Sequence, residues 1–360
     1  MIWITGGGTG GHLFPALNVA EEWARRRPGD AIRYLGARRG LEARVLPTRP
    51  WMHTLLPVRG DLRRSPGERL QFYARLSASL WACERLFRKE RPELVFGTGG
   101  YASYPAAQIA AWHGAPLFWQ EQNVNPGQVT RRLAASCRRV FAGFEETAVR
   151  LPGASVVHTG NPVRSDLPSG DRWRGRKAAG FAADDQVLLV LGGSGGASSI
   201  NAAIARLARL LHEKGGLRIW WQTGQRDYDT LKQQVAPELF PGTMTPFIEQ
   251  MPDAYAAADL VLARAGAMTT AEICAVGKPS VLVPFPHAAQ GHQEQNVEVL
   301  RKAGAALVVP DHELAGERLA ETLLNLAADR TQQVKLASAA RRLGRPDATL
   351  RIVDEMESLL

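Results

Sequence analysis

The chain has 360 residues, of which 45% are hydrophobic and 22% are charged, and its formal net charge is +9. This length exceeds that of one typical core and indicates two domains of roughly 150–200 residues each. No apolar stretch approaches the roughly 18–20 residues of a membrane span, and we expect no signal peptide. The three widely spaced cysteines favour buried thiols in a reducing compartment over disulfides or a metal site. The sequence therefore predicts a soluble, cytoplasmic protein.

The net positive charge is concentrated in one segment. Residues 59–91 contain nine basic and four acidic side chains, an excess of five that exceeds half of the net charge. Nucleic acid, an anionic membrane surface and a phosphorylated substrate all attract basic proteins. Because we find no helix-turn-helix, zinc-knuckle or RNA-motif signature, we expect no nucleic-acid partner.

Short apolar strands alternate with amphipathic helices along the chain. In the first half, strands are expected at 2–5, 32–35, 94–97, 117–120 and 140–142, and helices at 13–27 and 66–89. In the second half, strands are expected at 187–191, 218–222, 260–263, 280–283 and 306–309, and helices at 200–214 and 292–302. This alternation predicts parallel sheets with right-handed crossovers, which bind ligands at the carboxyl ends of their strands.

Two breaks in the pattern indicate domain boundaries. The run 159–164, Thr-Gly-Asn-Pro-Val-Arg, precedes a polar stretch with Gly and Pro, so we predict domains at 1–160 and 161–345. The second break, Gly344-Arg345-Pro346, precedes a final helix at 346–360 that could pack on either domain.

Each half opens with a strand, a glycine-rich turn and a helix. The two turns lie at residues 6–12 and 192–197. Glycine lets the backbone approach a ligand, and a helix N-terminus offers free N–H groups, so either turn could bind an anion. The first turn matches neither the dinucleotide fingerprint nor the P-loop, and the second could be merely a tight turn. His12, at the helix start, is either a general base or a helix-capping residue.

Other strands also end in polar residues. Arg264 and Glu272 follow one strand and suit the diphosphate and ribose of a nucleotide sugar, although an ion pair is the alternative. Gln293 and Asn296 share one helix face and could bind sugar hydroxyls. The D-x-D run from Asp227, a pattern that holds metal in some glycosyltransferases, is assigned here to helix capping.

The first half has two further clusters of this kind. Residues 97–101 form a third glycine turn, and residues 120–125 place Glu121 among several side-chain amides after an apolar strand. Glu121 is therefore a second candidate base.

Seven motifs occur in the order expected of the MurG family, which the chain resembles over nearly its whole length. They lie at 5–12, 97–101, 121–123, 160–164, 192–194, 264–272 and 293–296. This family comprises peripheral-membrane N-acetylglucosaminyltransferases that convert lipid I to lipid II in peptidoglycan synthesis. The resemblance implies an α/β GT-B fold of two Rossmann-like, doubly wound parallel-sheet domains with a cleft between them. It also implies that UDP-GlcNAc binds the second domain and the lipid acceptor the first, and that the final helix returns to the first domain.

The resemblance also implies roles for individual residues. The implied donor-binding residues are Arg164, Ser194, Ile248, Arg264, Ala267, Met268, Thr269, Glu272, Gln293 and Asn296, joined by Thr9, Gly10, Gly11 and Asn123 of the first domain. The acceptor side falls to Gly8, Tyr101 and Asn125, and catalysis to His12 and Glu121. In the implied inverting displacement, His12 is the general base and Glu121 orients or replaces it. We expect no obligatory metal or other cofactor.

Two residues depart from the family pattern. Gln120 stands where the family usually has His, which excludes a base at this position and strengthens the assignment to His12. Gly195 stands where the family commonly has Gln, which puts a side-chain role there in doubt.

The resemblance suggests a function for the basic segment of residues 59–91. Its helix carries a wider apolar stripe than one core face needs, as expected of a helix that rests on anionic headgroups. We assign Leu70, Leu80 and Trp81 to this membrane patch, and Leu76, Cys83 and Phe87 to the core. The expected location is the cytoplasmic face of the cell membrane, with cell-wall synthesis proteins as further partners.

Four alternatives stay open at this point. Another GT-B lipid glycosyltransferase would differ in its donor, and a UDP-GlcNAc 2-epimerase would need no membrane patch. A non-catalytic sugar-nucleotide-binding module is disfavoured by the presence of His12, Glu121, Arg264 and Glu272. A nicotinamide oxidoreductase is disfavoured because no acidic residue follows the second strand directly.

Overall fold

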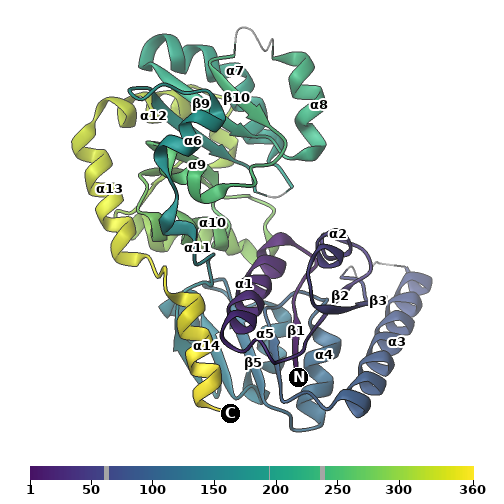
Figure 1. Cartoon of the computed structure of the whole chain (residues 1–360). Helices are drawn as coiled ribbons and strands as arrows, with labels where there is room; N and C mark the ends of the chain where they lie inside the picture. Colours follow the sequence, from purple (N-terminus) through teal and green to yellow (C-terminus); the bar gives the residue numbers. More distant parts are fainter. Residues whose placement is uncertain (61–64, 194, 236–239) are drawn as a thin grey trace. The chain divides into compact units, whose positions relative to one another are not determined.

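The computed structural model describes residues 1–60, 65–193, 195–235 and 240–360. The chain forms two compact units, one of Met1–Val163 with Asp347–Leu360 and one of Arg164–Pro346. Each unit is built on a parallel β-sheet with helices on its faces (Figure 1).

The first unit has a seven-stranded sheet in the order β3-β2-β1-β4-β5-β6-β7. Its strands are β1 (Ile2–Thr5), β2 (Ile32–Ala37), β3 (Met52–Leu56), β4 (Leu94–Gly97), β5 (Leu117–Glu121), β6 (Arg139–Ala142) and β7 (Val156–His158). From β1 the strands are added towards one side of the sheet as far as β3, and β4 then starts on the other side of β1. In such sheets the ligand site lies at this switch point in strand order.

The helices of the first unit cover both sheet faces. They are α1 (Gly10–Arg26), α2 (Glu42–Val45), α3 (Pro66–Glu90), α4 (Tyr104–Trp112), α5 (Gln128–Leu133) and α14 (Ala348–Ser358). Alternate side chains of a strand point to opposite faces, so Trp3 packs with α3 and α4, whereas Ile2 and Ile4 pack with α1 and α14. Helix α14 lies against α1 (Figure 1), where Arg26 forms an ion pair with Glu357 at 3.2 Å.

The second unit has a six-stranded sheet in the order β10-β9-β8-β11-β12-β13. The strands are β8 (Gln186–Leu191), β9 (Leu217–Gln222), β10 (Gly242–Thr245), β11 (Leu260–Arg264), β12 (Ser280–Val283) and β13 (Leu307–Val308). The helices are α6 (Arg172–Ala179), α7 (Ser198–Gly215), α8 (Gln225–Gln234), α9 (Met251–Ala257), α10 (Ala267–Val276), α11 (His292–Lys302), α12 (Arg318–Ala328) and α13 (Arg330–Leu343).

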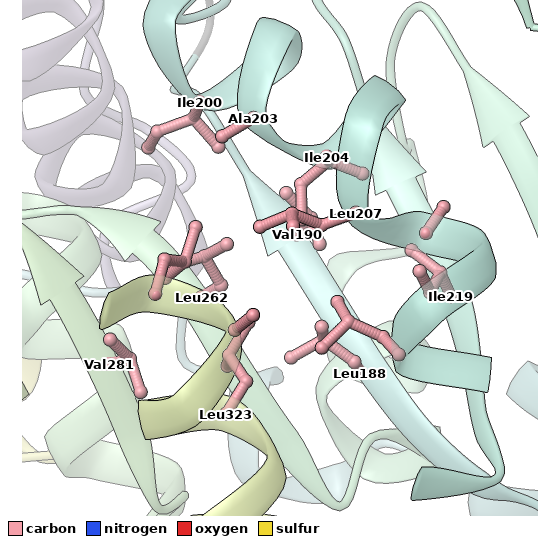
Figure 2. Packing of buried hydrophobic residues seen from close by; sticks show 14 of the residues in the cluster. Leu188, Val190, Ile200, Ala203, Ile204, Leu207, Ile219, Leu262, Val281 and Leu323 are labelled. Atoms are coloured by element: carbon pink, nitrogen blue, oxygen red, sulfur yellow. The ribbon is translucent and has the colours of Figure 1, made fainter. Parts of the chain in front are cut away.

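Strand β8 lies in the middle of the second sheet and is buried by the helices that cover it. Figure 2 shows Val190 of β8 close to Ile204 and Leu207 of α7, and all three are buried. Leu323 of α12 joins the same cluster, so α7 and α12 cover one face together. The continuous apolar sequence of β8 follows from this burial, because central parallel strands are covered on both faces.

The predicted α/β class with two parallel sheets is confirmed, and each predicted strand has a counterpart. The three edge strands β3, β7 and β10 were not predicted, because their side chains are largely half-buried or exposed and give no apolar run. All three cysteines are free and buried, as expected. Among the described residues, no helix is long and apolar enough to cross a membrane.

The structure of α3 shows that one residue of the predicted membrane patch, Leu80, belongs to the core face of the helix. Leu80 is half-buried and packs on the core cluster that contains Cys83 and Phe87. The exposed face carries Leu70 at 73%, Tyr73 at 56% and Trp81 at 62% exposure. The helical period explains the difference, since Leu76, Leu80, Cys83 and Phe87 recur at intervals of 4, 3 and 4. We define the exposed face of Leu70, Tyr73 and Trp81 as the α3 patch.

Candidate active site

In the first unit, the first and third glycine turns meet at the carboxyl ends of β1 and β4. Thr5 and Gly97 are register partners, and the Thr98 N–H donates to the Thr5 carbonyl at 3.0 Å. The Thr98 hydroxyl donates to the His12 carbonyl at 2.6 Å. These bonds tie the start of α1, where His12 lies, to the turn after β4.

His12 and Tyr101 both lie against glycine backbone. A Cβ atom at Gly100 would lie 2.9 Å from the His12 ring, and one at Gly8 would lie 2.6 Å from the Tyr101 ring. The N-cap position of α1 belongs to Thr9, so His12 is not the capping residue. The half-buried imidazole therefore lies at the sheet edge, near Tyr101, where a parallel sheet binds its ligand.

The first glycine turn is also held by two side chains from beyond β1. The Tyr34 hydroxyl donates to the Gly6 carbonyl at 2.8 Å, and the Gly8 N–H donates to the Glu42 carboxylate at 2.7 Å. Burial, and then the Glu42 carboxylate, raise the pKa of Tyr34 well above 10. Because Glu42 takes the Gly8 N–H, this amide is not available to an anion. Sequence reasoning missed Glu42, which comes from a four-residue helix 34 positions away.

Glu121 holds its own loop in place. One carboxylate oxygen accepts the Asn123 N–H at 3.0 Å, and the other accepts the Gly127 N–H at 3.0 Å and the Thr130 hydroxyl. The Asn123 amide also donates to Glu121 at 3.1 Å. With both oxygens bound in this way and 3% of the residue exposed, the carboxylate shapes the 121–130 loop.

The Gln120 side chain is completely buried. Its amide donates to Asn161 at 2.9 Å, and Asn161 in turn donates to the Gln122 carbonyl at 3.0 Å. Gln120, which replaces the usual histidine of the family, is therefore a packed residue whose hydrogen bond to Asn161 holds the run 159–163 in place. Asn125 lies farther along the same loop, where its side-chain oxygen accepts hydrogen bonds from Arg131 at 2.5 Å and Arg150 at 3.4 Å.

In the second unit, the glycine turn after β8 is more open. A Cβ atom at Gly193 or Gly195 would meet no described atom within 4 Å, whereas one at Gly196 would lie 2.3 Å from the Thr223 carbonyl. Gly196 has a φ of +77°, which favours glycine. Ser194, the predicted donor-binding residue of this turn, lies outside the described residues.

Arg264 is buried and already paired. Its guanidinium forms an ion pair with Asp311 and donates to the Ser199 hydroxyl, and it lies 5.3 Å from the centre of the Phe285 ring. The Asp311 carboxylate therefore compensates the charge that the sequence assigned to a diphosphate. Ser199 therefore bridges Arg264 and Asp311, and the N-cap of α7 is Ala197.

Glu272 is a carboxyl group of this site with a shifted pKa. Burial raises its pKa from 4.5 to about 7, opposed by the Tyr255 hydroxyl and by the Arg164 guanidinium. Tyr255 donates to a Glu272 oxygen at 3.0 Å. Arg164 is half-exposed and also pairs with Asp166 at 2.7 Å. A proton can therefore be gained or lost at Glu272 near neutral pH.

The remaining predicted donor residues are divided between the two units. Ile248 donates its N–H to Gln222 at 2.9 Å, and Gln222 donates to the Gly193 carbonyl at 3.3 Å, which links the turn after β8 to the Ile248 backbone. Gln293 accepts the Phe285 N–H at 2.9 Å. Asn296 is fully buried in α11, and Ala267, Met268 and Thr269 form the first turn of α10. Thr9, Gly10 and Gly11 lie at the start of α1 in the first unit.

The D-x-D run does not cap its helix as expected. The N-cap of α8 is Gly224, and the Asp227 carboxylate instead accepts hydrogen bonds from Ser198 at 2.8 Å and Asn201 at 2.9 Å. Asp227 therefore ties α8 to the start of α7. Within the described ranges, no group of three His, Cys, Asp or Glu side chains is placed to hold a metal ion.

Comparison with family models gives the class of the protein. Residues 2–142 match the N-terminal domain of glycosyltransferase family 28, and residues 187–352 match its C-terminal domain. These two matches cover most of both units, so the protein is a glycosyltransferase with a parallel-sheet fold in each unit.

Full-length relatives narrow this class. The chain is 40% identical over 357 residues to a protein from Moorella thermoacetica, covering 97% of this chain and 96% of the relative. It is 41% identical over 368 residues to one from Chlorobium luteolum, covering 99% of each. Both relatives are named UDP-N-acetylglucosamine–N-acetylmuramyl-(pentapeptide) pyrophosphoryl-undecaprenol N-acetylglucosamine transferase.

Solved structures agree with this result. MurG from Acinetobacter baumannii superposes with a TM-score of 0.77 at 27% identity and 99% coverage of both chains. The UDP-GlcNAc 2-epimerase from Neisseria meningitidis gives a TM-score of 0.69 at 18% identity, which shows the fold alone. The chain belongs to the MurG family within glycosyltransferase family 28.

Proposed function

We propose that the protein transfers GlcNAc from UDP-GlcNAc to the 4-hydroxyl of MurNAc in undecaprenyl-pyrophosphoryl-MurNAc-pentapeptide, lipid I. The observation that carries this proposal is the full-length similarity, at 38–41% identity, to transferases named for this reaction. Each unit contributes support, because the first offers a candidate base, His12, and the second an open glycine turn together with the carboxylate of Glu272 on another element.

In the proposed reaction, the acceptor hydroxyl attacks the anomeric carbon as UDP leaves, which inverts the configuration at that carbon. His12 takes the proton from the hydroxyl, and its half-buried ring lies beside the Gly99 and Gly100 backbone of the third glycine turn. Glu121 acts as a positioning residue for the loop that carries Asn123 and Asn125, since its oxygens are bound within that loop.

The donor is proposed to bind the second unit, with the diphosphate near the turn 192–197 and the ribose hydroxyls on Glu272. The N-termini of α7 and α10 and the half-exposed Arg164 stabilise the charge on departing UDP. Arg264 holds Asp311 and Ser199 and thereby positions the start of α7. No obligatory metal takes part in this proposal, so a chelator should leave turnover unchanged.

We further propose that the first unit rests on an anionic membrane surface through the α3 patch. Trp81 is exposed and stacks with the Arg85 guanidinium at 4.9 Å from the ring centre, a pairing of apolar and basic groups suited to headgroups. A lipid-anchored acceptor would be reached from that surface.

The test is transfer of labelled GlcNAc from UDP-GlcNAc to a short-chain lipid I analogue, with UDP-glucose in parallel. We expect product from UDP-GlcNAc alone. Product mainly from UDP-glucose would keep the glycosyltransferase class and overturn the donor. Absence of product from either donor, in protein that binds UDP-GlcNAc, would overturn the acceptor.

A further inference from the structure

Glu42 is a buried carboxylate beneath the first glycine turn. The residue is 0% exposed, and its side chain is enclosed by glycines. A Cβ atom would lie 1.9 Å from Glu42 at Gly7, 3.2 Å at Gly36 and 2.7 Å at Gly40. Glycine is needed most at Gly7, where a Cβ atom would overlap the carboxylate, whereas Gly36 and Gly40 let the Glu42 side chain pack closely.

The hydrogen bonding of Glu42 is directed at the turn. One carboxylate oxygen accepts the Gly8 N–H at 2.7 Å and lies 3.4 Å from the Ala37 N–H, while the other is buried and has no hydrogen-bond partner among the described residues. A buried, incompletely bonded carboxylate costs stability, and an apolar side chain of similar size would avoid that cost. The arrangement therefore contributes little to folding beyond its bond to Gly8.

That bond acts where the turn has most freedom. Gly8 has a φ of +88°, a conformation that glycine adopts without strain but does not prefer over others. Its neighbour Thr9 begins α1, because the Thr9 carbonyl accepts the His12 N–H at 3.2 Å and the Leu13 N–H at 3.0 Å. On the other side, Gly8 lies against the Tyr101 ring.

We propose that Glu42 is a positioning residue: by accepting the Gly8 N–H, it fixes the first glycine turn and with it the start of α1 that carries His12. The inference rests on the proposed function, in which His12 acts on the acceptor hydroxyl. A base displaced by about 1 Å can lose on the order of 10²-fold in rate, so a fixed turn has a direct catalytic value.

The experiment compares Glu42→Leu with Glu42→Gln in the full chain. Leucine has a similar size but no acceptor, whereas the amide oxygen of glutamine can still accept the Gly8 N–H. We expect Glu42→Leu to lower kcat with the lipid I analogue by roughly 10- to 100-fold, and Glu42→Gln by at most about threefold. The KM for UDP-GlcNAc should change less than kcat in both, because most implied donor residues lie in the second unit and only Thr9, Gly10 and Gly11 directly follow the turn.

Glu90→Leu is the matched control. Glu90 is a half-buried acid of the first unit and accepts hydrogen bonds from Trp3 at 2.9 Å and Arg33 at 2.8 Å, away from the glycine turn. Its replacement should lower the unfolding temperature but leave the kcat of folded protein as in the wild type. Equal losses of kcat in Glu90→Leu and Glu42→Leu would overturn the positioning role.

A second readout does not depend on turnover. Amide hydrogen exchange in the peptide spanning residues 5–13 should accelerate in Glu42→Leu and stay slow in Glu42→Gln. Unchanged exchange or unchanged kcat in Glu42→Leu would overturn the proposal, as would equal losses in both Glu42 variants. A wild-type protein without transfer activity would contradict the proposed function instead, and the exchange experiment would still test the role of Glu42.

Discussion

The two glycine turns of this chain have similar sequences but different surroundings. In the first turn, the Glu42 side chain packs against Gly7 and accepts the Gly8 N–H, and the Tyr101 ring packs against Gly8. In the second turn, a Cβ atom at Gly193 or Gly195 would meet no described atom within 4 Å. A strand, a glycine turn and a helix therefore do not by themselves make an anion site.

The difference comes from residues far away in the sequence. In the first unit, the acid that binds the turn comes from α2, and the aromatic ring comes from the turn after β4. In the second unit, Gln222 donates to the Gly193 carbonyl and the Thr223 carbonyl lies against Gly196. The first turn is thus suited to hold His12 in place, and the second to receive a ligand.

Substitution of His12, which the first turn holds in place, should have the largest effect on activity. His12→Ala should lower turnover with the lipid I analogue by roughly 10²–10⁴-fold, because the acceptor hydroxyl loses its base. The dissociation constant of UDP-GlcNAc should hardly change. The exposed His53, on β3, provides the control His53→Ala with normal turnover. Turnover of His12→Ala within a few-fold of wild type would remove His12 from the role of base.

The two units should also differ in membrane binding, because the α3 patch belongs to the first unit. Leu70→Ser combined with Trp81→Ser should weaken binding to anionic vesicles by about tenfold or more, because two exposed apolar side chains no longer enter the lipid. Vesicle flotation measures this effect, with Val334→Ser, an exposed apolar residue of the second unit, as control. Leu80→Ser should mainly lower stability, since Leu80 packs on the core. Vesicle binding that survives the double substitution would contradict the patch.

Glu272 should give donor binding a pH dependence. Its pKa of about 7 means that the carboxylate, which accepts ribose hydroxyls, forms as the pH rises through 7. UDP-GlcNAc affinity should therefore increase several-fold from pH 6 to pH 8. Calorimetric titrations should show this dependence abolished in Glu272→Gln and shifted to higher pH in Tyr255→Phe, which loses the hydrogen bond that lowers the pKa. A flat wild-type profile would contradict the role of Glu272.

Gly195 should show the smallest effect. Because a Cβ atom there would meet no described atom within 4 Å, Gly195→Gln should fold normally and change UDP-GlcNAc affinity by at most about twofold. Thermal unfolding and calorimetry check both expectations. A large loss of affinity would show that the second turn is less open than its surroundings indicate.

The sequence predicted the central strands and the turns that follow them, because buried parallel strands form apolar runs that end in glycine or polar residues. It could not predict Glu42, since nothing near this residue indicates a partner 34 positions earlier. Nor did it predict that Arg264 is neutralised by Asp311, which comes from a distant loop. The assignment of Leu80 was within reach, because its spacing from Leu76 and Cys83 already follows the buried face of α3.

The most direct test of the different roles of the two turns is the UDP-GlcNAc affinity of two glycine variants. Gly196→Ala adds a Cβ atom 2.3 Å from the Thr223 carbonyl at a φ of +77°, and Gly7→Ala adds one 1.9 Å from Glu42. Both substitutions distort their turns. We predict that Gly196→Ala weakens UDP-GlcNAc binding by about tenfold or more, because it strains a backbone position that favours glycine. Gly7→Ala should abolish turnover and weaken binding much less, because most implied donor residues lie in the second unit. Equal loss of affinity in both variants would contradict the account.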